Sequence, residues 1–253
     1  MEAQGGNERL NLISTTSTLV HEALHGPDAG RRHAQARLLE RYGGAVRRYL
    51  QASARDADAA DELFQEFALR LCDGNLSGFN PERGRFRDFV KGVLLHLVLN
   101  YHGQRGKQPR PLASDHPGPA VEPPSLLDVE RDFLASWRDE LLARAWDLLA
   151  QSDQATGQPF YTVLRFRADH PEMPSAQMAV ELGKQLDRSL TAAGVRQTLR
   201  RAREKFAQLL VDEVVQSLAA PTPEQIEQEL AQLGLLEYCQ TVLQQLDTPQ
   251  AKS

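Results

Sequence analysis

Apolar residues recur at the spacing of an α-helix along most of the chain, and this periodicity restricts the fold more than any other feature. No segment shows a convincing strand-like alternation, and no internal repeat of fixed period is present. Residues 108–124, QPRPLASDHPGPAVEPP, interrupt the periodicity with prolines and short polar residues that disfavour helix and bury little apolar surface. The sequence therefore predicts an all-α fold in which a Pro-rich linker joins two small helical domains.

The periodic segments divide the chain into five predicted parts. In chain order these are a lead-in helix (1–33), a first domain (34–107), a linker (108–128), a second domain (129–218) and an acidic helical extension (219–253). The expected helices lie at about 34–51, from 58, from 86, at 129–150, at 160–168 and as a pair after Pro174. The extension is expected to be one amphipathic segment, which starts with a capping-box pattern at Thr222 and Gln225.

The apolar stripe of each helix is expected to lie in the core of its own domain. Phe64 belongs to the stripe of the helix that begins near 58. Phe133 and Trp137 are expected in the core of the second domain, and Tyr238 belongs to the stripe of the extension.

Composition excludes several classes of protein. The longest apolar run falls short of the roughly 20 residues that span a bilayer, and the N-terminus lacks a signal-peptide pattern, so a cytoplasmic location is expected. The two cysteines, Cys72 and Cys239, are far apart and lack metal-ligand spacing, which argues against a disulfide framework or a zinc finger. Both are expected to be ordinary buried thiols.

Charge is distributed unevenly along the chain. The net charge of −5 argues against a polycation that coats nucleic acid without specificity. Residues 194–205 nevertheless hold several cations and only one acid, Glu204, whereas acidic residues gather at 56–66 and 224–237. Phosphate binding is therefore expected from a local basic face.

Residues 175–209 have the pattern of a helix-turn-helix. A helix over 175–186 is followed by a short break and by a second helix in which Arg196, Arg200 and Arg203 share an outward face at i, i+4 and i+7. Such a face suits the major groove of DNA, where Arg reads guanine edges. The pattern fits a solvated basic face on an ordinary bundle helix equally well.

Two further segments carry polar faces with two interpretations each. In DADAADELFQEFALRL, at 56–71, the polar residues either cap and solvate the helix or form an acidic docking surface for a basic partner. In the helix from 86, the regular spacing of Phe86, Phe89 and Tyr101 favours core packing over base stacking. The better candidates for DNA contact lie near its far end: His96, Asn100, His102, Arg105 and Lys107.

One competing motif is His21, Glu22 and His25, which spell HExxH and could place two imidazoles on a zinc ion. A catalytic zinc needs a third ligand, and no residue is marked as one, so the match is interpreted as accidental. A zinc hydrolase remains the remote alternative. No cofactor is expected, and no other catalytic motif is apparent.

Taken together, these motifs resemble the extracytoplasmic-function sigma factors of bacterial RNA polymerase over roughly residues 18–218. DADAADELFQEFALRL is similar to the polymerase-binding helix of that family. FNPERGRFRDFVKGVLLHLVLN is similar to its promoter-melting segment, with Phe79, Pro81, Gly84 and Phe86 in hallmark positions. VRQTLRRAREKF resembles the end of the domain that reads the upstream, minus-thirty-five element. ERDFLASWRDELLARAW and REKFAQLLVDEVVQSL resemble a branch common in planctomycete-like bacteria.

The resemblance implies a set of functional residues. Those implied to bind polymerase are Asp61, Glu62, Gln65 and Glu66. Those implied to bind DNA are His96, Asn100, Arg105, Lys107, Thr191, Arg196, Gln197, Arg200, Arg201 and Arg203. His96 stands where the family usually has Asn, and Asp187 stands in the turn where Gly is common.

The same resemblance implies a transcription initiation factor that is not itself an enzyme. Its expected partners are core RNA polymerase and promoter DNA, with an anti-sigma factor or regulatory protein as a further candidate, and it would lie near the nucleoid through polymerase. A stand-alone helix-turn-helix regulator is the main alternative.

Overall fold

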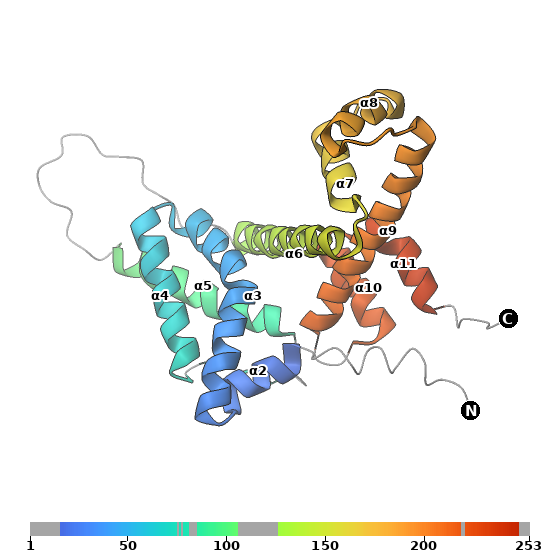
Figure 1. The fold of residues 1–253 in the computed structure, drawn as a ribbon. Helices are drawn as coiled ribbons and strands as arrows, with labels where there is room; N and C mark the ends of the chain where they lie inside the picture. Colours follow the sequence, from blue (N-terminus) through green and yellow to red (C-terminus); the bar gives the residue numbers. More distant parts are fainter. Residues whose placement is uncertain are drawn as a thin grey trace, which may run out of the picture. The chain divides into compact units, whose positions relative to one another are not determined.

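The computed structural model describes residues 16–74, 76, 78–80, 85–105, 126–218 and 221–247 (Figure 1). Within these ranges the regular structure is helical and no strand occurs, which confirms the predicted all-α class. The helices are α2 (Thr16–His25), α3 (Asp28–Ala54), α4 (Ala57–Cys72), α5 (Phe86–Arg105), α6 (Leu126–Thr156), α7 (Phe160–Asp169), α8 (Ser175–Leu186), α9 (Ala192–Ser217), α10 (Pro223–Gln232) and α11 (Leu236–Asp247). In the described part, no helix has the length and apolar character to cross a membrane.

The chain forms two compact units. The first unit contains α2 to α5 and α6 up to Glu140, and the second contains α6 from Leu141, α7, α8, α9 up to Val215, α10 and α11. Residues 108–125 of the predicted linker (108–128) lie outside the described residues, whereas residues 126–128 form the start of α6. The domain boundaries stay a prediction. In the structure, α6 contributes residues to both units.

In the first unit, α3 is the central helix. Its long apolar stripe is buried against α2, α4 and α5, and two of its aromatic residues also pack against α6. Tyr42 stacks on Trp137 with ring centroids 4.7 Å apart, and Tyr49 meets Phe133 edge-on at 5.6 Å. Sequence reasoning assigned Phe133 and Trp137 to the second domain, whereas their contacts lie in the first unit. Periodicity identifies a buried face but not the element that covers it.

Gln35 joins three helices inside the first unit. It is 3% exposed, and its amide nitrogen Nε2 lies 3.1 Å from the Ala23 carbonyl, 3.0 Å from that of Leu71 and 3.2 Å from that of Cys72. These carbonyls lie in the last turns of α2 and α4, where backbone acceptors lack partners within their own helices. The Gln35 amide supplies a buried donor to the Ala23 and Leu71 carbonyls and a part-buried one to that of Cys72.

Replacing Gln35 with leucine should therefore lower the free energy of unfolding of the first unit by about 2–3 kcal/mol, because buried acceptors lose their donor. Urea denaturation followed by circular dichroism measures this loss. Gln51→Leu changes an exposed glutamine of the same helix and should shift stability by less than about 0.5 kcal/mol. Equal stability of the two variants would show that the Gln35 contacts contribute nothing.

In the second unit, α9 is the central helix. Trp146 of α6 packs against Phe206 with ring centroids 4.6 Å apart, and Arg144 Nε lies 2.7 Å from Oε2 of Glu213, which is 2% exposed. Asp153 of α6 accepts the backbone N–H groups of Phe160 and Tyr161, and it thereby caps the start of α7. These contacts fix α6 and α7 against α9.

The extension contains two helices and not the single segment predicted. Gly234, with φ of 68°, ends α10 and allows the chain to turn into α11. The predicted capping box is confirmed, because Thr222 and Gln225 exchange hydrogen bonds between side chain and backbone. Tyr238 was expected in the core but is 42% exposed, because the turn at Gly234 changes the register of the buried stripe.

The two cysteines lie in different environments, which corrects the expectation that both are buried. Cys72 is exposed at the end of α4, whereas Cys239 is fully buried in α11. Burial raises the pKa of the Cys239 thiol from 9.0 to about 11. At pH 8 the buried thiol therefore stays protonated as well as inaccessible.

A thiol reagent at pH 8 should modify Cys72 rapidly and Cys239 only after the second unit unfolds. Since the unfolded thiol ionises near pH 9 and the native thiol near 11, the stability of this unit should fall as the pH rises between these values. Time-resolved labelling with a chromogenic disulfide measures both rates. In Cys72→Ser the fast phase should vanish, and a fast phase that persists would contradict the assignment.

Candidate functional site

The residues implied to bind polymerase share the outward face of α4. The Asp56 carboxylate caps this helix by accepting the Ala59 N–H, and Leu63, Phe67 and Leu71 bury the inward face. Asp61, Glu62, Gln65 and Glu66 are all exposed. We call the exposed residues 61, 62, 65, 66 and 69 the α4 face.

Two of the four polar residues of the α4 face form ion pairs within the chain. Arg47 of α3 lies with Nη1 3.0 Å from Asp61 Oδ1, and its guanidinium sits 3.8 Å from the centre of the Phe64 ring. Phe64 is consequently half-buried under Arg47 and not in the core as predicted. Glu66 pairs with Arg70 at 2.5 Å along the helix. In the described part of the chain, no such pair engages Glu62, and Gln65 is uncharged.

Leu69 completes the α4 face, and sequence reasoning missed it. Its exposed fraction of 61% exceeds that of any other large apolar residue described, and it follows Gln65 by one helical turn. An exposed leucine one turn beyond the acidic residues gives the face an apolar end beside a negative region. The sequence could have identified Leu69 as exposed, because this leucine lies on the polar side of the amphipathic helix.

The outward face of α5 carries the candidates for contact with a DNA strand. His96 and Asn100 are exposed one turn apart, and Leu99 beside them is 46% exposed. A Cβ added at Gly92 or Gly103 would meet no atom within 4 Å, so the two ends of this face are open. His102 differs, because its Nε2 lies 3.2 Å from the Ser53 carbonyl and ties α5 to α3.

The structure describes only part of the remaining melting-segment residues. Phe79 packs against Phe86 and Phe89 with ring centroids 5.5 Å apart in both cases, which anchors the chain just before α5. Pro81, Gly84 and Lys107 lie outside the described residues. Arg105 is the last residue of α5, and its side chain also lies outside them.

The basic candidates of the second unit all lie on exposed positions of α9 or at its start. These are Thr191, Arg196, Gln197, Arg200, Arg201 and Arg203. The Thr191 hydroxyl oxygen accepts the Gly194 N–H at 3.0 Å and so caps α9. Arg200 pairs with Glu204 at 3.2 Å, whereas Arg196, Arg201 and Arg203 form no ion pair within the described ranges. We call Arg196, Arg200 and Arg203 the basic face.

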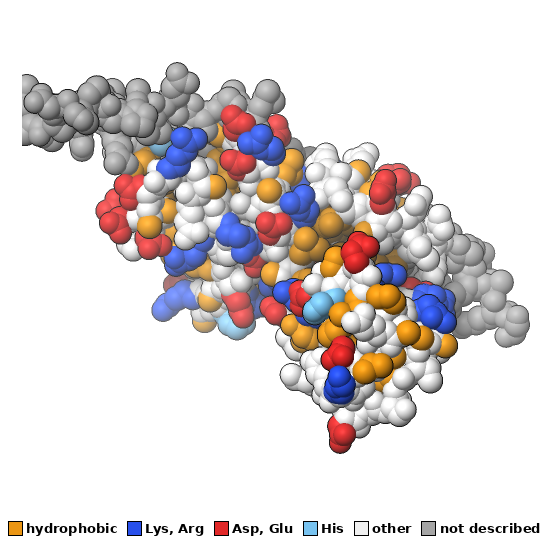
Figure 2. Space-filling view, turned by 90° about the horizontal axis from the view of Figure 1, so that it is seen from above, with side chains coloured by type: hydrophobic (Ala, Val, Ile, Leu, Met, Phe, Trp, Pro, Cys, Tyr) orange, Lys and Arg blue, Asp and Glu red, His pale blue; other side chains and the backbone are white. Residues whose placement is uncertain are grey.

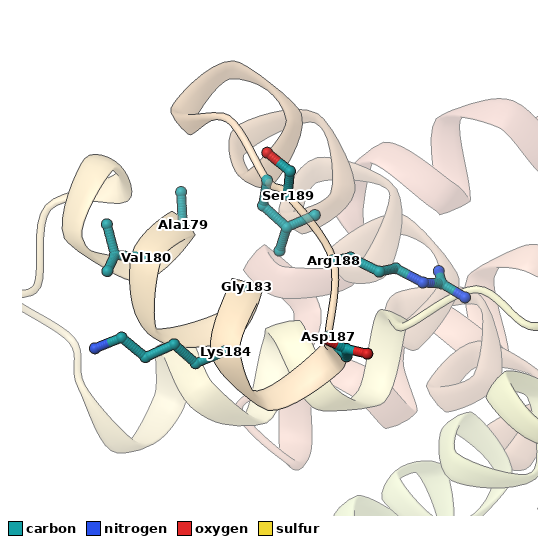
Figure 3. A pocket seen from close by; sticks show the side chains of 8 residues that line it. Ala179, Val180, Gly183, Lys184, Asp187, Arg188 and Ser189 are labelled. Atoms are coloured by element: carbon teal, nitrogen blue, oxygen red, sulfur yellow. The ribbon is translucent and has the colours of Figure 1, made fainter.

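The segment between α8 and α9 makes a tight turn. Asp187 adopts a φ of 50°, a conformation in which glycine is usual. A Cβ at Gly183 would come within 2.9 Å of the Arg188 carbonyl oxygen, so only glycine permits this approach. The turn encloses a shallow hollow of about 430 Å³. Lys184 and Arg188 at its edge point to opposite sides in Figure 3, so they do not converge on one ligand.

Charged groups elsewhere are mixed. On the face in Figure 2, Lys and Arg side chains alternate with Asp and Glu in small groups. Among the ion pairs of the described chain is that of Arg165 with Asp169 at 3.4 Å. Such exposed pairs contribute little stability. That view shows no broad field of one sign.

The HExxH residues lie on α2. The rings of His21 and His25 are 5.2 Å apart, and the Glu22 carboxylate lies against Gly30 of α3. No group of three or more metal-ligating side chains occurs among the described residues, so the third ligand that the hydrolase alternative requires is not found there.

Comparison with protein families identifies the segment that holds α4 and α5. Residues 38–108 match the family model described as Sigma-70 region 2. This segment is therefore similar to a sigma-70 region 2 domain. Such a domain supports a role for the chain as a sigma factor in transcription initiation, with core RNA polymerase and promoter DNA as partners. Comparison with curated proteins gave no match, and comparison with solved structures gave none either.

Proposed function

We propose that this chain is an extracytoplasmic-function sigma factor that binds core RNA polymerase through the α4 face and directs it to selected promoters. The observation that carries the proposal is the position of this face. It lies inside the region 2 domain, and it presents Glu62, Gln65 and Leu69 to solvent without partners in the described chain. The subtype and its planctomycete-like branch rest on the resemblance of the motifs.

The α4 face suits a basic, amphipathic helix of the polymerase. Leu69 would enter the apolar side of such a helix, while Glu62 and Gln65 would pair with its polar side. Arg47 and Arg70 hold Asp61 and Glu66 in place, so these carboxylates are pre-oriented before the partner arrives. Affinity would come chiefly from the centre of the face.

Leu69→Ser should weaken polymerase binding about tenfold or more and leave the stability of the region 2 domain unchanged. The side chain is already exposed, so its loss leaves no cavity, whereas a buried apolar anchor in the complex contributes strongly. Titration of labelled core polymerase measures the affinity. Val180→Ser, at a 56% exposed position in the second unit, serves as the matched control. Unchanged affinity of Leu69→Ser would remove Leu69 from the interface.

The open face of α5 would hold a separated DNA strand. His96 and Asn100 offer hydrogen-bonding groups to an unpaired base, and Leu99 offers an apolar surface to the face of that base. Binding an extruded base offsets the few kcal/mol that unstacking requires. Arg105 and Lys107 would contact the backbone phosphates of the same strand.

The basic face of α9 would read the upstream promoter element in the major groove. Arg196 and Arg200 suit guanine edges, and Gln197 suits adenine. Thr191, Arg201 and Arg203 would contact phosphates and set the position of the helix. Because the polymerase tethers both DNA-binding faces, each acts at a raised effective concentration, so a chain with a net charge of −5 can still act on DNA.

Polymerase-dependent opening of DNA tests the proposal. Core polymerase is mixed with promoter fragments from the genome that encodes the chain, and permanganate then detects unstacked thymines. We expect a short reactive stretch only when chain and core are both present. His96→Ala with Asn100→Ala should reduce this reactivity but leave binding to polymerase intact. Equal opening without the chain would contradict the proposed function.

A further inference from the structure

The basic face of α9 continues into a buried stripe. Arg196, Arg200 and Arg203 follow one line along the helix, and Ala207 and Leu210 extend that line by steps of four and three residues. The three arginines are exposed, whereas Ala207 is 3% exposed and Leu210 is fully buried. The same surface of one helix is therefore open at its start and covered farther along.

At Ala207, cover comes from the C-terminal hairpin, which we define as α10 and α11. In Figure 1 these two helices lie beside the C-terminal part of α9. Cys239 Sγ lies 4.0 Å from the Ala207 carbonyl oxygen, and the Tyr238 ring meets the Phe206 ring edge-on with centroids 5.9 Å apart. The start of α11 therefore borders the basic face directly beyond Arg203.

Tyr238 differs from the other large apolar residues of the described hairpin. Ile226, Leu230 and Val242 are at most 3% exposed, whereas Tyr238 is 42% exposed. Partial burial raises the pKa of the Tyr238 phenol to about 12, and the neighbouring charge of Arg203 acts in the opposite direction. The phenol is therefore close to the Arg203 cation and remains a hydrogen-bond donor at neutral pH.

We propose that Tyr238 extends the DNA-binding surface of α9 by donating its hydroxyl hydrogen to a phosphate oxygen of the DNA backbone. Tyrosine is among the side chains that bind DNA phosphates. Its ring is held on Phe206, so little conformational freedom is lost when the contact forms. This inference rests on the proposed role of α9, and it gives the C-terminal hairpin a part in binding promoter DNA.

The salt dependence of DNA affinity distinguishes a neutral hydrogen-bond donor from a cation. Removing the Tyr238 hydroxyl should weaken binding about two- to tenfold, the range for loss of one hydrogen bond. It should leave the salt dependence unchanged, because no counterion release is lost. Removing the charge of Arg203 should instead reduce the slope of log affinity against log salt by about one.

The experiment measures fluorescence anisotropy of a 30-base-pair duplex pool of random sequence with the full chain, at several salt concentrations. Tyr238→Phe keeps the ring on Phe206 and tests the hydroxyl alone, and an unchanged melting temperature verifies its fold. Tyr161→Phe is the matched control, because Tyr161 also meets an aromatic ring edge-on, that of Trp146 at 5.8 Å. Arg203→Ala is the reference variant in which the slope of log affinity against log salt should change.

Weaker binding of Tyr238→Phe, with an unchanged slope and wild-type binding of Tyr161→Phe, is the expected result. Wild-type affinity of Tyr238→Phe would overturn the inference. If Arg196→Ala with Arg200→Ala still abolishes binding in that case, the proposed role of α9 stands by itself. If neither Tyr238→Phe nor the double arginine variant alters binding, both proposals fail.

Discussion

Replacing Gln65 and Glu66 together with alanine should reduce the affinity for core RNA polymerase by about 100-fold or more and abolish promoter-directed transcription. Both residues lie at the centre of the α4 face, where contacts contribute most of the binding energy of an interface. The loss of the exposed pair between Glu66 and Arg70 should cost the fold less than about 1 kcal/mol. Affinity is measured by titrating labelled core polymerase with each variant.

The matched control for this variant is Glu40→Ala with Gln51→Ala. It removes the same two residue types from exposed positions of α3 in the same unit. We expect wild-type affinity and transcription from the control. A stand-alone helix-turn-helix regulator would keep its DNA-directed activity when Gln65 and Glu66 are replaced, and that result would favour the alternative function.

Deleting residues 221–253 should prevent the second unit from folding. The hairpin buries Ile226, Leu230, Leu233, Leu235 and Val242. Burial of each such side chain contributes roughly 1.5–3 kcal/mol, and their sum is comparable with the whole stability of a small domain. Without the hairpin, the contact between Cys239 and the Ala207 carbonyl of α9 would also be lost. Loss of the cooperative thermal transition of this unit, followed by circular dichroism, is the expected outcome.

Deleting only residues 248–253 provides the control, because it leaves α10 and α11 complete. This shorter chain should melt like the full one. If the chain that ends at residue 220 also melted like the full one, the hairpin would be an appendage and not a layer of the second unit.

Much of the fold could be predicted because the spacing of apolar residues along the sequence indicates where the helices lie. The helix at 175–186 was predicted at its observed bounds, as was the capping box at Thr222. The break at Gly234 was missed because the apolar residues on either side continue one apparent stripe. The partners of Phe133 and Trp137 were also missed. The periodicity of apolar residues indicates that one face of a helix is buried, but it does not identify the element against which that face packs.

In the candidate site, too, some features could be predicted from helical spacing and others depend on tertiary packing. The outward positions of Gln65, Asn100 and Arg196 follow from helical spacing and agree with their exposure. The pairing of Asp61 with Arg47 links two helices, so it depends on tertiary packing that spacing within one helix does not contain. Leu69 was overlooked because a single apolar residue on the polar face of a helix matches no known motif. Its exposure in the structure marks it as a candidate interface residue.

Run-off transcription tests the central claim most directly. Purified core polymerase transcribes a pool of promoter fragments with and without the full chain, and sequencing of the transcripts locates their starts. We expect defined starts that require the chain and that disappear when Gln65 and Glu66 are replaced. An identical set of transcripts with and without the chain, together with no measurable binding to core polymerase, would contradict the assignment of this protein as a sigma factor.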